Sequence, residues 1–207
     1  MESEQLNNVD GQMPRRKKDI KKEEENIILM YLHDFVVAIV AIMLVFFLLF
    51  RVVVVSGPSM EDTLYNGDYL LLANKILYPK PQAGDIIVVS KDSFRDGEPI
   101  IKRVIATEGQ TVDIDFPNGI VYVDGVALDE PYTKTPTNLN EGGNYPITVE
   151  KGHVFAMGDN RNDSIDSRSP DIGQVDLREI LGKAFFLFLP GTDENEAREF
   201  NRIGVLK

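Results

Sequence analysis

Three short polar segments carry the residues that could perform chemistry. The first places Ser59 directly after Ser56-Gly57-Pro58, a run that predicts a constrained turn exposing both the hydroxyl and the backbone N–H of the serine. A hydroxyl on such a turn is a candidate nucleophile if a base lies close enough to take its proton. Taken alone, a Gly-Pro-Ser run is most often only a turn.

The second segment, residues 100–105 (IIKRVI), places a lysine within a predicted strand. Because side chains alternate along a strand, Lys102 shares a face with Ile100 and Val104. If that face is buried, loss of hydration lowers the pKa of the lysine and yields the neutral amine that a general base requires. The alternative is an edge strand that exposes Lys102 and buries Arg103 in its place.

The third segment, residues 157–168 (MGDNRNDSIDSR), follows a predicted apolar strand. Its polar side chains can bond to nearby backbone and form a rigid turn. A calcium loop is the alternative, but the sixth position from Asp159 is Ser164 rather than glycine, and the twelfth is Pro170 rather than glutamate. We therefore predict no metal site here.

Composition excludes several other kinds of site. The chain has no cysteine, which excludes thiolate nucleophiles, disulfides and cysteine metal sites, and its two histidines argue against a histidine-rich metal centre. The net charge of -11 argues against nucleic-acid binding, which needs a basic face to neutralise phosphates. Nucleic acid is therefore not an expected partner.

A long apolar run predicts a membrane anchor. Residues 35–50 (FVVAIVAIMLVFFLLF) contain no polar side chain, and as a helix they would span about 24 Å, short of a ~30 Å hydrocarbon core. Extension upstream to residue 27 or downstream to residue 55 supplies the missing length, so we predict an anchor within 27–55. The run exceeds the apolar core of a cleaved leader, and no small-residue cleavage site follows it.

The segment before this anchor predicts its orientation. Residues 1–26 form a polar tail, predicted to be flexible and cytoplasmic, since it carries a basic cluster of Arg15, Arg16, Lys17, Lys18, Lys21 and Lys22. Residues 56–207 are then extracytoplasmic. We expect a single-pass protein of the cell membrane, with the lipid bilayer as a partner.

Residues 56–207 predict one β-rich domain. Candidate strands are 69–73, 85–90, 100–107, 111–115, 119–123, 153–157 and 183–189, each short, rich in Val, Ile, Phe or Tyr and bounded by turn residues. Asp124-Gly125 between two apolar runs predicts a type I′ hairpin. Residues 176–181 predict a short helix, and residues 131–145 a mobile, turn-rich loop.

Together, in this order after an anchor, SGPSM, IIKRVIATEG and GDNRNDSIDSR closely resemble the sequence boxes of the bacterial type I signal peptidases, a family of Ser/Lys serine endopeptidases. The resemblance runs from the anchor to about Pro190, and the single anchor is similar to that of Gram-positive members. It implies a mainly β, signal-peptidase-like catalytic domain preceded by one N-terminal transmembrane helix. It implies no cofactor.

The resemblance also implies a role for each matching residue. Ser59 would attack the scissile carbonyl and form an acyl-enzyme, Lys102 would be the general base, and Ser164 would orient the lysine. Arg103 and Asp159 would form a structural ion pair beside the site. Asp166 and Arg168 would hold the third segment in shape.

Two positions depart from the family pattern. Gly57 stands where some members carry a hydroxyl that helps to bind the oxyanion, which leaves the Ser59 backbone N–H as the first candidate donor. Asp62 stands where the family usually has proline. The implied substrates are secretory preproteins with small residues at positions -1 and -3 of the cleavage site, and a secretion translocon is a further expected partner.

Three other interpretations remain at this point. A catalytically silent anchored domain would bind partners without cleaving them. A different Ser/Lys protease would process a specialised substrate. A Ser-His mechanism would need His33, which precedes the anchor on its cytoplasmic side, or His153, which opens the strand before the third segment.

Overall fold

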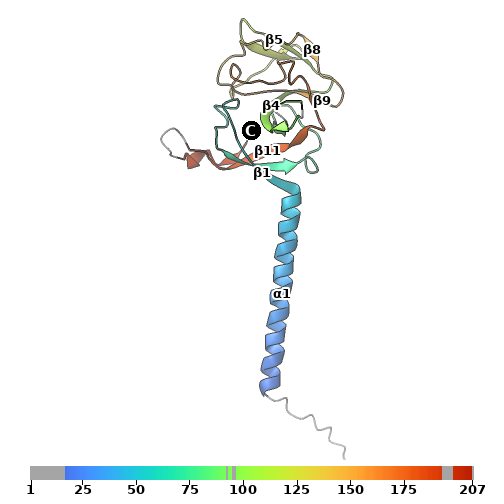
Figure 1. The fold of residues 1–207 in the computed structure, drawn as a ribbon, viewed down its shortest axis with the longest axis vertical. Coiled ribbons are helices and arrows are strands. Elements are labelled where there is room, and N and C mark those ends of the chain that lie inside the picture. Colours follow the sequence, from blue (N-terminus) through green and yellow to red (C-terminus); the bar gives the residue numbers. More distant parts are fainter. Residues whose placement is uncertain (1–16, 92, 95–96, 193–197, 207) are drawn as a thin grey trace, which may run out of the picture. The chain divides into compact units, whose positions relative to one another are not determined.

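The computed structural model of the chain describes residues 17–91, 93–94, 97–192 and 198–206 (Figure 1). The chain divides into two units, Met1–Phe46 and Phe47–Lys207. The first consists of most of one helix, and the second contains all of the strands described below.

The helix, α1 (Lys17–Leu49), contains a stretch of 24 residues, Asn26–Leu49, that is long and apolar enough to cross a membrane. At 1.5 Å per residue it measures about 36 Å, which exceeds a ~30 Å hydrocarbon core. The predicted tail is shorter than expected, because Lys- and Glu-rich sequence favours helix and α1 already begins at Lys17. Residues 1–16 of that tail lie outside the described residues.

The predicted anchor boundary at residue 55 is wrong. The helix ends at Leu49, and Phe50–Val54 form a strand, β1, that pairs with β2 (Tyr69–Asn74). The run of β-branched valines from Val52 favours a strand, and pairing with β2 satisfies its backbone. The β-rich domain therefore begins before residue 56.

Antiparallel strands build two sheets. The larger sheet has the order β1-β2-β11-β3-β4-β9-β10, with β12 (Gly204–Val205) paired to β11 (Ile180–Leu189). Its other strands are β3 (Ile86–Val89), β4 (Ile100–Thr107), β9 (His153–Met157) and β10 (Val175–Asp176). The smaller sheet has the order β7 (Val126–Ala127), β6 (Ile120–Val123), β5 (Thr111–Asp115), β8 (Ile147–Thr148). A short 3-10 helix, η2 (Phe200–Arg202), precedes β12.

Both faces of the larger sheet are covered along β3 and β4. On β3, Ile86 and Val88 join one apolar cluster, while Ile87 and Val89 join another on the opposite face. A third cluster packs the smaller sheet against β4 and β9, with Phe155 among its fully buried members. Burial of each large apolar side chain stabilises the domain by about 1.5–3 kcal/mol. Because all three clusters contain residues of β4, this strand is held by more apolar packing than one cluster alone provides.

The seven predicted strands are present with modest changes in their bounds. The Asp124-Gly125 hairpin joins β6 to β7, and both turn residues have the positive φ that a type I′ turn needs, 52° and 78°. The predicted helix over residues 176–181 is wrong. That segment comprises the end of β10, a turn and the start of β11, because ladder pairing with β9 and β3 outweighs a weak helical pattern.

Residues 131–145 have little regular structure, and hydrogen bonds attach them to the third polar segment. Arg161 donates to the hydroxyl of the buried Thr137 at 2.8 Å, and Arg168 donates to the carbonyl oxygen of Leu139 at 3.1 Å. The side-chain amide of Asn162 donates to both Thr135 and Pro136. The third polar segment therefore holds this connection in place.

Replacement of Arg161 by Met tests that attachment. Arg161 is buried, and its two terminal nitrogens lie 2.8 and 2.6 Å from the carboxylate oxygens of Glu130. The variant leaves a nearly buried carboxylate without its cation, which costs about 3–5 kcal/mol. We expect Arg161→Met to lower the melting temperature of the detergent-solubilised chain by roughly 10 °C, as followed by circular dichroism.

The matched control is Arg178→Met. Arg178 also pairs with an aspartate, Asp176, but its side chain is 88% exposed, and exposed ion pairs contribute little to stability. We expect its melting temperature to match that of the wild type. Equal melting temperatures for the two variants would contradict the stabilising role of the Arg161–Glu130 pair, which lies directly before this connection.

Candidate active site

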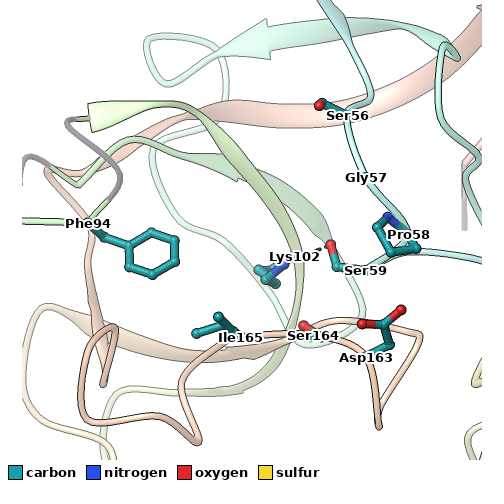
Figure 2. A pocket seen from close by; sticks show the side chains of 9 residues that line it. All are labelled: Ser56, Gly57, Pro58, Ser59, Phe94, Lys102, Asp163, Ser164 and Ile165. Atoms are coloured by element: carbon teal, nitrogen blue, oxygen red, sulfur yellow. Dashed lines mark hydrogen bonds between the residues drawn. The ribbon is translucent and has the colours of Figure 1, made fainter.

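The turn that carries Ser59 is anchored on both sides. Before it, Val55 is buried and exchanges backbone hydrogen bonds with Gly67 and Asp68 at 2.9 and 2.8 Å. After it, Met60 and Leu64 are buried in the cluster that includes Val55. These apolar anchors fix the backbone on either side of Ser59 and leave its hydroxyl at a cavity (Figure 2).

Lys102 lies on β4, an interior strand between β3 and β9, opposite Ile87. Its neighbours Ile100 and Val104 belong to the apolar cluster on one face of the sheet, as the period of two predicts. The residue is only 4% exposed, and Arg103 is buried as well, so the alternative of an edge strand that buries Arg103 in place of Lys102 is wrong. The amine of Lys102 donates to the Ser59 hydroxyl oxygen at 2.8 Å.

The cavity around this contact has a volume of about 160 Å³. Figure 2 shows the Ser59 hydroxyl and the Lys102 amine directed at each other within it. All three polar segments reach this cavity, since Asp163, Ser164 and Ile165 also line it. Phe94, which sequence reasoning missed, contributes an aromatic ring to the lining; no motif in the sequence marks it.

Arg103 and Asp159 form a buried ion pair beside the site. Two guanidinium nitrogens of Arg103 donate to the two carboxylate oxygens at 2.9 and 2.7 Å, and a third donates to the carbonyl oxygen of Gly84 at 2.9 Å. The Tyr132 ring lies 4.0 Å from the guanidinium carbon. The hydroxyl of Thr63 also donates to Asp159 at 2.6 Å, which links the ion pair to the turn that carries Ser59.

Two residues of the third segment contact the serine turn directly, and sequence reasoning missed both. Asn160 donates its backbone N–H to the Ser59 carbonyl oxygen at 3.0 Å and its side-chain amide to the Pro58 carbonyl oxygen at 3.1 Å. Gly158 lies so close that an added Cβ would be 2.5 Å from the Ser59 carbonyl oxygen and 2.2 Å from the Ser164 hydroxyl. The Gly-Asp-Asn run directly after an apolar strand is the signal that could have found them.

Ser164 is buried, and its hydroxyl donates to Asp166 at 2.9 Å. Its oxygen keeps lone pairs that can accept a further hydrogen bond on the side of the cavity. Asp166 in turn accepts the backbone N–H of Gly158 at 2.9 Å and two guanidinium bonds from Arg168 at 2.9 and 2.8 Å. Asp166 and Arg168, both buried, thus fix the geometry of the third segment around Ser164.

Both residues that depart from the family pattern, Asp62 and Gly57, have a positive φ. Asp62 has a φ of 77°, in the left-handed region, where proline with its fixed negative φ cannot stand. Gly57 has a φ of 87° and donates its N–H to the side-chain oxygen of Asn66 at 3.1 Å. A side chain at position 57 would therefore be strained even though the space around it is open.

Neither histidine takes part in this cavity. His153 begins β9, with its imidazole 4.0 Å from Asp176, and is not among the residues that line the cavity; His33 lies in α1. Over the described ranges, no group of three or more His, Asp or Glu side chains is placed to hold a metal ion. Among the residues that line this cavity, Ser59 and Lys102 are joined by the 2.8 Å hydrogen bond.

Residues 28–189 match the family model described as signal peptidase, peptidase S26. The chain is 40% identical over 146 residues to a probable signal peptidase I-1 of Synechocystis sp., covering 67% of this chain and 70% of the relative. It is 29% identical over 198 residues to a signal peptidase I of Bacillus amyloliquefaciens, covering 92% and 100% of the two chains.

Among solved structures, a signal peptidase I from Enterococcus faecalis V583 shares 31% identity, with a TM-score of 0.42, over 50% of this chain and 96% of that chain. The family model alone spans well over half of the sequence, from within the apolar helix to the end of β11. This chain therefore belongs to the signal peptidase family, peptidase S26.

Proposed function

We propose that Ser59 and Lys102 form the catalytic dyad of this membrane-anchored signal peptidase, a serine endopeptidase that removes signal peptides from secretory preproteins. One observation carries the proposal, the 2.8 Å contact between the Lys102 amine and the Ser59 hydroxyl within a cavity. A serine hydroxyl is a weak nucleophile until a base takes its proton. No side chain other than Lys102 has a described hydrogen bond to this hydroxyl.

In this mechanism the neutral amine of Lys102 accepts the proton of Ser59 as the oxygen attacks the scissile carbonyl carbon. The tetrahedral intermediate then collapses to an acyl-enzyme, and Lys102 delivers the proton to the departing amine of the mature protein. A water molecule then attacks the acyl-enzyme in the same way, again with Lys102 as the base that takes its proton. Burial of Lys102 supports this role because a low-dielectric site disfavours its ammonium form.

The oxyanion of each tetrahedral intermediate needs donors aimed at it, and the backbone N–H of Ser59 is the proposed first donor. Gly57 offers no hydroxyl, and its left-handed backbone disfavours any residue that would. Ser164 is the proposed orienting group for Lys102. Its place in the same cavity and its bond to the fixed Asp166 support that role.

By resemblance to the family, the proposed precursors carry small residues at positions -1 and -3 of the cleavage site, next to the cavity that holds Ser59. The basic cluster before the apolar helix supports an N-terminus in the cytoplasm, with the β domain on the other side of the bilayer. Only nine residues lie between the end of α1 and Ser59, and the ten steps from Leu49 to Ser59 span about 35 Å at most. The nucleophile would then act close to the membrane surface.

Removal of either dyad side chain tests the mechanism. We expect Ser59→Ala and Lys102→Met to lower the rate of preprotein cleavage by about 10³-fold or more, because each removes one partner of the proton transfer. Cleavage is measured with the detergent-solubilised chain and a fluorescent secretory preprotein. Lys75→Met, which alters an exposed lysine, should cleave at the wild-type rate. Substantial turnover by a folded Lys102→Met variant would exclude Lys102 as the base.

A second test concerns the close approach of Gly158. An added Cβ cannot fit between the Ser59 carbonyl oxygen and Ser164, so Gly158→Ala must push the serine turn and Ser164 apart. We expect kcat to fall at least about tenfold, since a displacement of about 1 Å can cost a hundredfold in rate. Gly204→Ala is the control because a Cβ there meets nothing within 4 Å. If Gly158→Ala kept the wild-type kcat, this contact would not be needed for the geometry of the dyad.

A further inference from the structure

A half-buried glutamate of the 131–145 connection, Glu141, lines a cavity that Ser164 also lines. The side chain of Glu141 is 10% exposed, and its Oε1 atom lies 3.1 Å from the Nη2 atom of Arg168. Its Oε2 atom accepts the backbone N–H of Asp166 at 3.3 Å. Glu141 therefore contacts the two residues that fix the third polar segment.

The charges in this cluster do not balance. Asp166 also contacts Nη2 of Arg168, at 2.8 Å, so two carboxylates share one guanidinium group. The other guanidinium nitrogens donate to Asp166 and to the carbonyl oxygen of Leu139. One negative charge is left over in a place with little water, and such a charge is costly.

Unsatisfied polar atoms mark the same place. Across the described residues, the buried side-chain oxygens and nitrogens without a hydrogen-bond partner are Oε1 of Glu141 and the hydroxyl oxygen of Tyr145. Buried polar atoms are almost always bonded, so each exception needs an explanation. Oε1 of Glu141 thus has only the ionic contact with Arg168 at 3.1 Å, and a proton on Glu141 removes the excess negative charge of the cluster.

Glu141 is coupled to the dyad through Ser164. Residues 163–165 line the cavity that holds Ser59 and Lys102, and they also line a second cavity of about 360 Å³ to which Glu141 contributes. The hydroxyl of Ser164 bonds to Asp166, the residue that Glu141 contacts. Glu141 and Lys102 also attract each other electrostatically when both are charged.

We propose that Glu141 is a positioning residue for the cleavage reaction, whose protonation sets the charge behind Ser164 and thereby how readily Lys102 releases its proton. The inference rests on the proposed role of Lys102 as the base. An ionised Glu141 stabilises the ammonium form of Lys102 and so opposes formation of the base. A neutral Glu141 lifts that opposition, because the remaining Asp166 and Arg168 compensate each other.

The surroundings of Glu141 place this change near neutral pH. The pKa of Glu141 is raised to about 7, mainly by burial and to a smaller extent by repulsion from Asp166. Attraction to Arg168 and to Lys102 lowers it. Other ionisable groups facing the cluster are the Tyr145 phenol, whose pKa burial raises, and the carboxylates of Asp163 and Asp171, which line the second cavity. Glu141 therefore changes charge near neutral pH.

The pH dependence of kcat/KM for Glu141→Gln tests the proposal. The ascending limb of that profile reports formation of the base in the free enzyme. We expect the limb of Glu141→Gln to move to lower pH by about half a unit, roughly a threefold gain in kcat/KM on the limb, with the same alkaline plateau. The assay uses the detergent-solubilised full chain and a fluorescent secretory preprotein. Glu150→Gln, at an exposed glutamate, is the matched control and should follow the wild-type profile.

Thermal stability provides a readout that does not depend on activity. The pKa of Glu141 in the folded protein, about 7, lies above its ordinary value of 4.5, so the folded state binds more protons than the unfolded state between these values. Wild-type stability therefore falls as the pH rises through this window, whereas Glu141→Gln lacks this loss. The melting temperature of the variant minus that of the wild type should grow from about pH 4.5 to about pH 7 and then level off.

Three outcomes would overturn the inference. They are a Glu141→Gln profile that superimposes on that of the wild type, a kcat/KM reduced equally at every pH, and a variant that fails to fold, since removing an uncompensated charge should not destabilise the domain. An active Lys102→Met variant would instead show that Lys102 is not the base. No result with Glu141→Gln could show this, so failure of the two proposals can be told apart. A shifted limb together with an inactive Lys102→Met variant supports both proposals.

Discussion

The burial of the Lys102 amine beside Ser59 is the constraint on which the rest of the domain depends. A lysine resists burial, and here it is tolerated because β4 is an interior strand and the amine has the Ser59 hydroxyl as a partner. Strands on both sides of β4 cover it, and apolar clusters cover both faces of the sheet there. The sheet thus surrounds Lys102 with apolar side chains, and the serine turn supplies the contact of its amine at the cavity.

Three arginines of the domain are fully buried, namely Arg103, Arg161 and Arg168. Each pairs with an acid, namely Asp159, Glu130 and Asp166 in turn. Such pairs gain little net stability over apolar packing, but their bidentate geometry admits few alternative arrangements. In this domain they tie β4, the third polar segment and the 131–145 connection to the serine turn, where a small displacement would separate the dyad.

The sequence was most informative where local patterns act alone. Alternation of side chains predicts the face of Lys102, and Asp124-Gly125 predicts its hairpin, because both depend on neighbouring residues only. Two predictions failed where pairing between strands decides the structure. Val52 and its neighbours pair with β2 instead of extending the predicted anchor, and residues 176–181 contribute to β10 and β11 instead of forming a helix. Phe94 could not be predicted as part of the site, because its place there depends on proximity across the fold.

The 131–145 connection shows which contacts composition does not predict. Gly, Pro, Asn and Thr predict turns correctly, but they say nothing about partners elsewhere, and here the third polar segment supplies them. Arg168 links both features, since it donates to the carbonyl oxygen of Leu139 in the connection and also contacts the carboxylate of Glu141. The residue that attaches the connection therefore also brings a second carboxylate beside Asp166, so that attachment of the connection and electrostatic tuning at this site share one arginine.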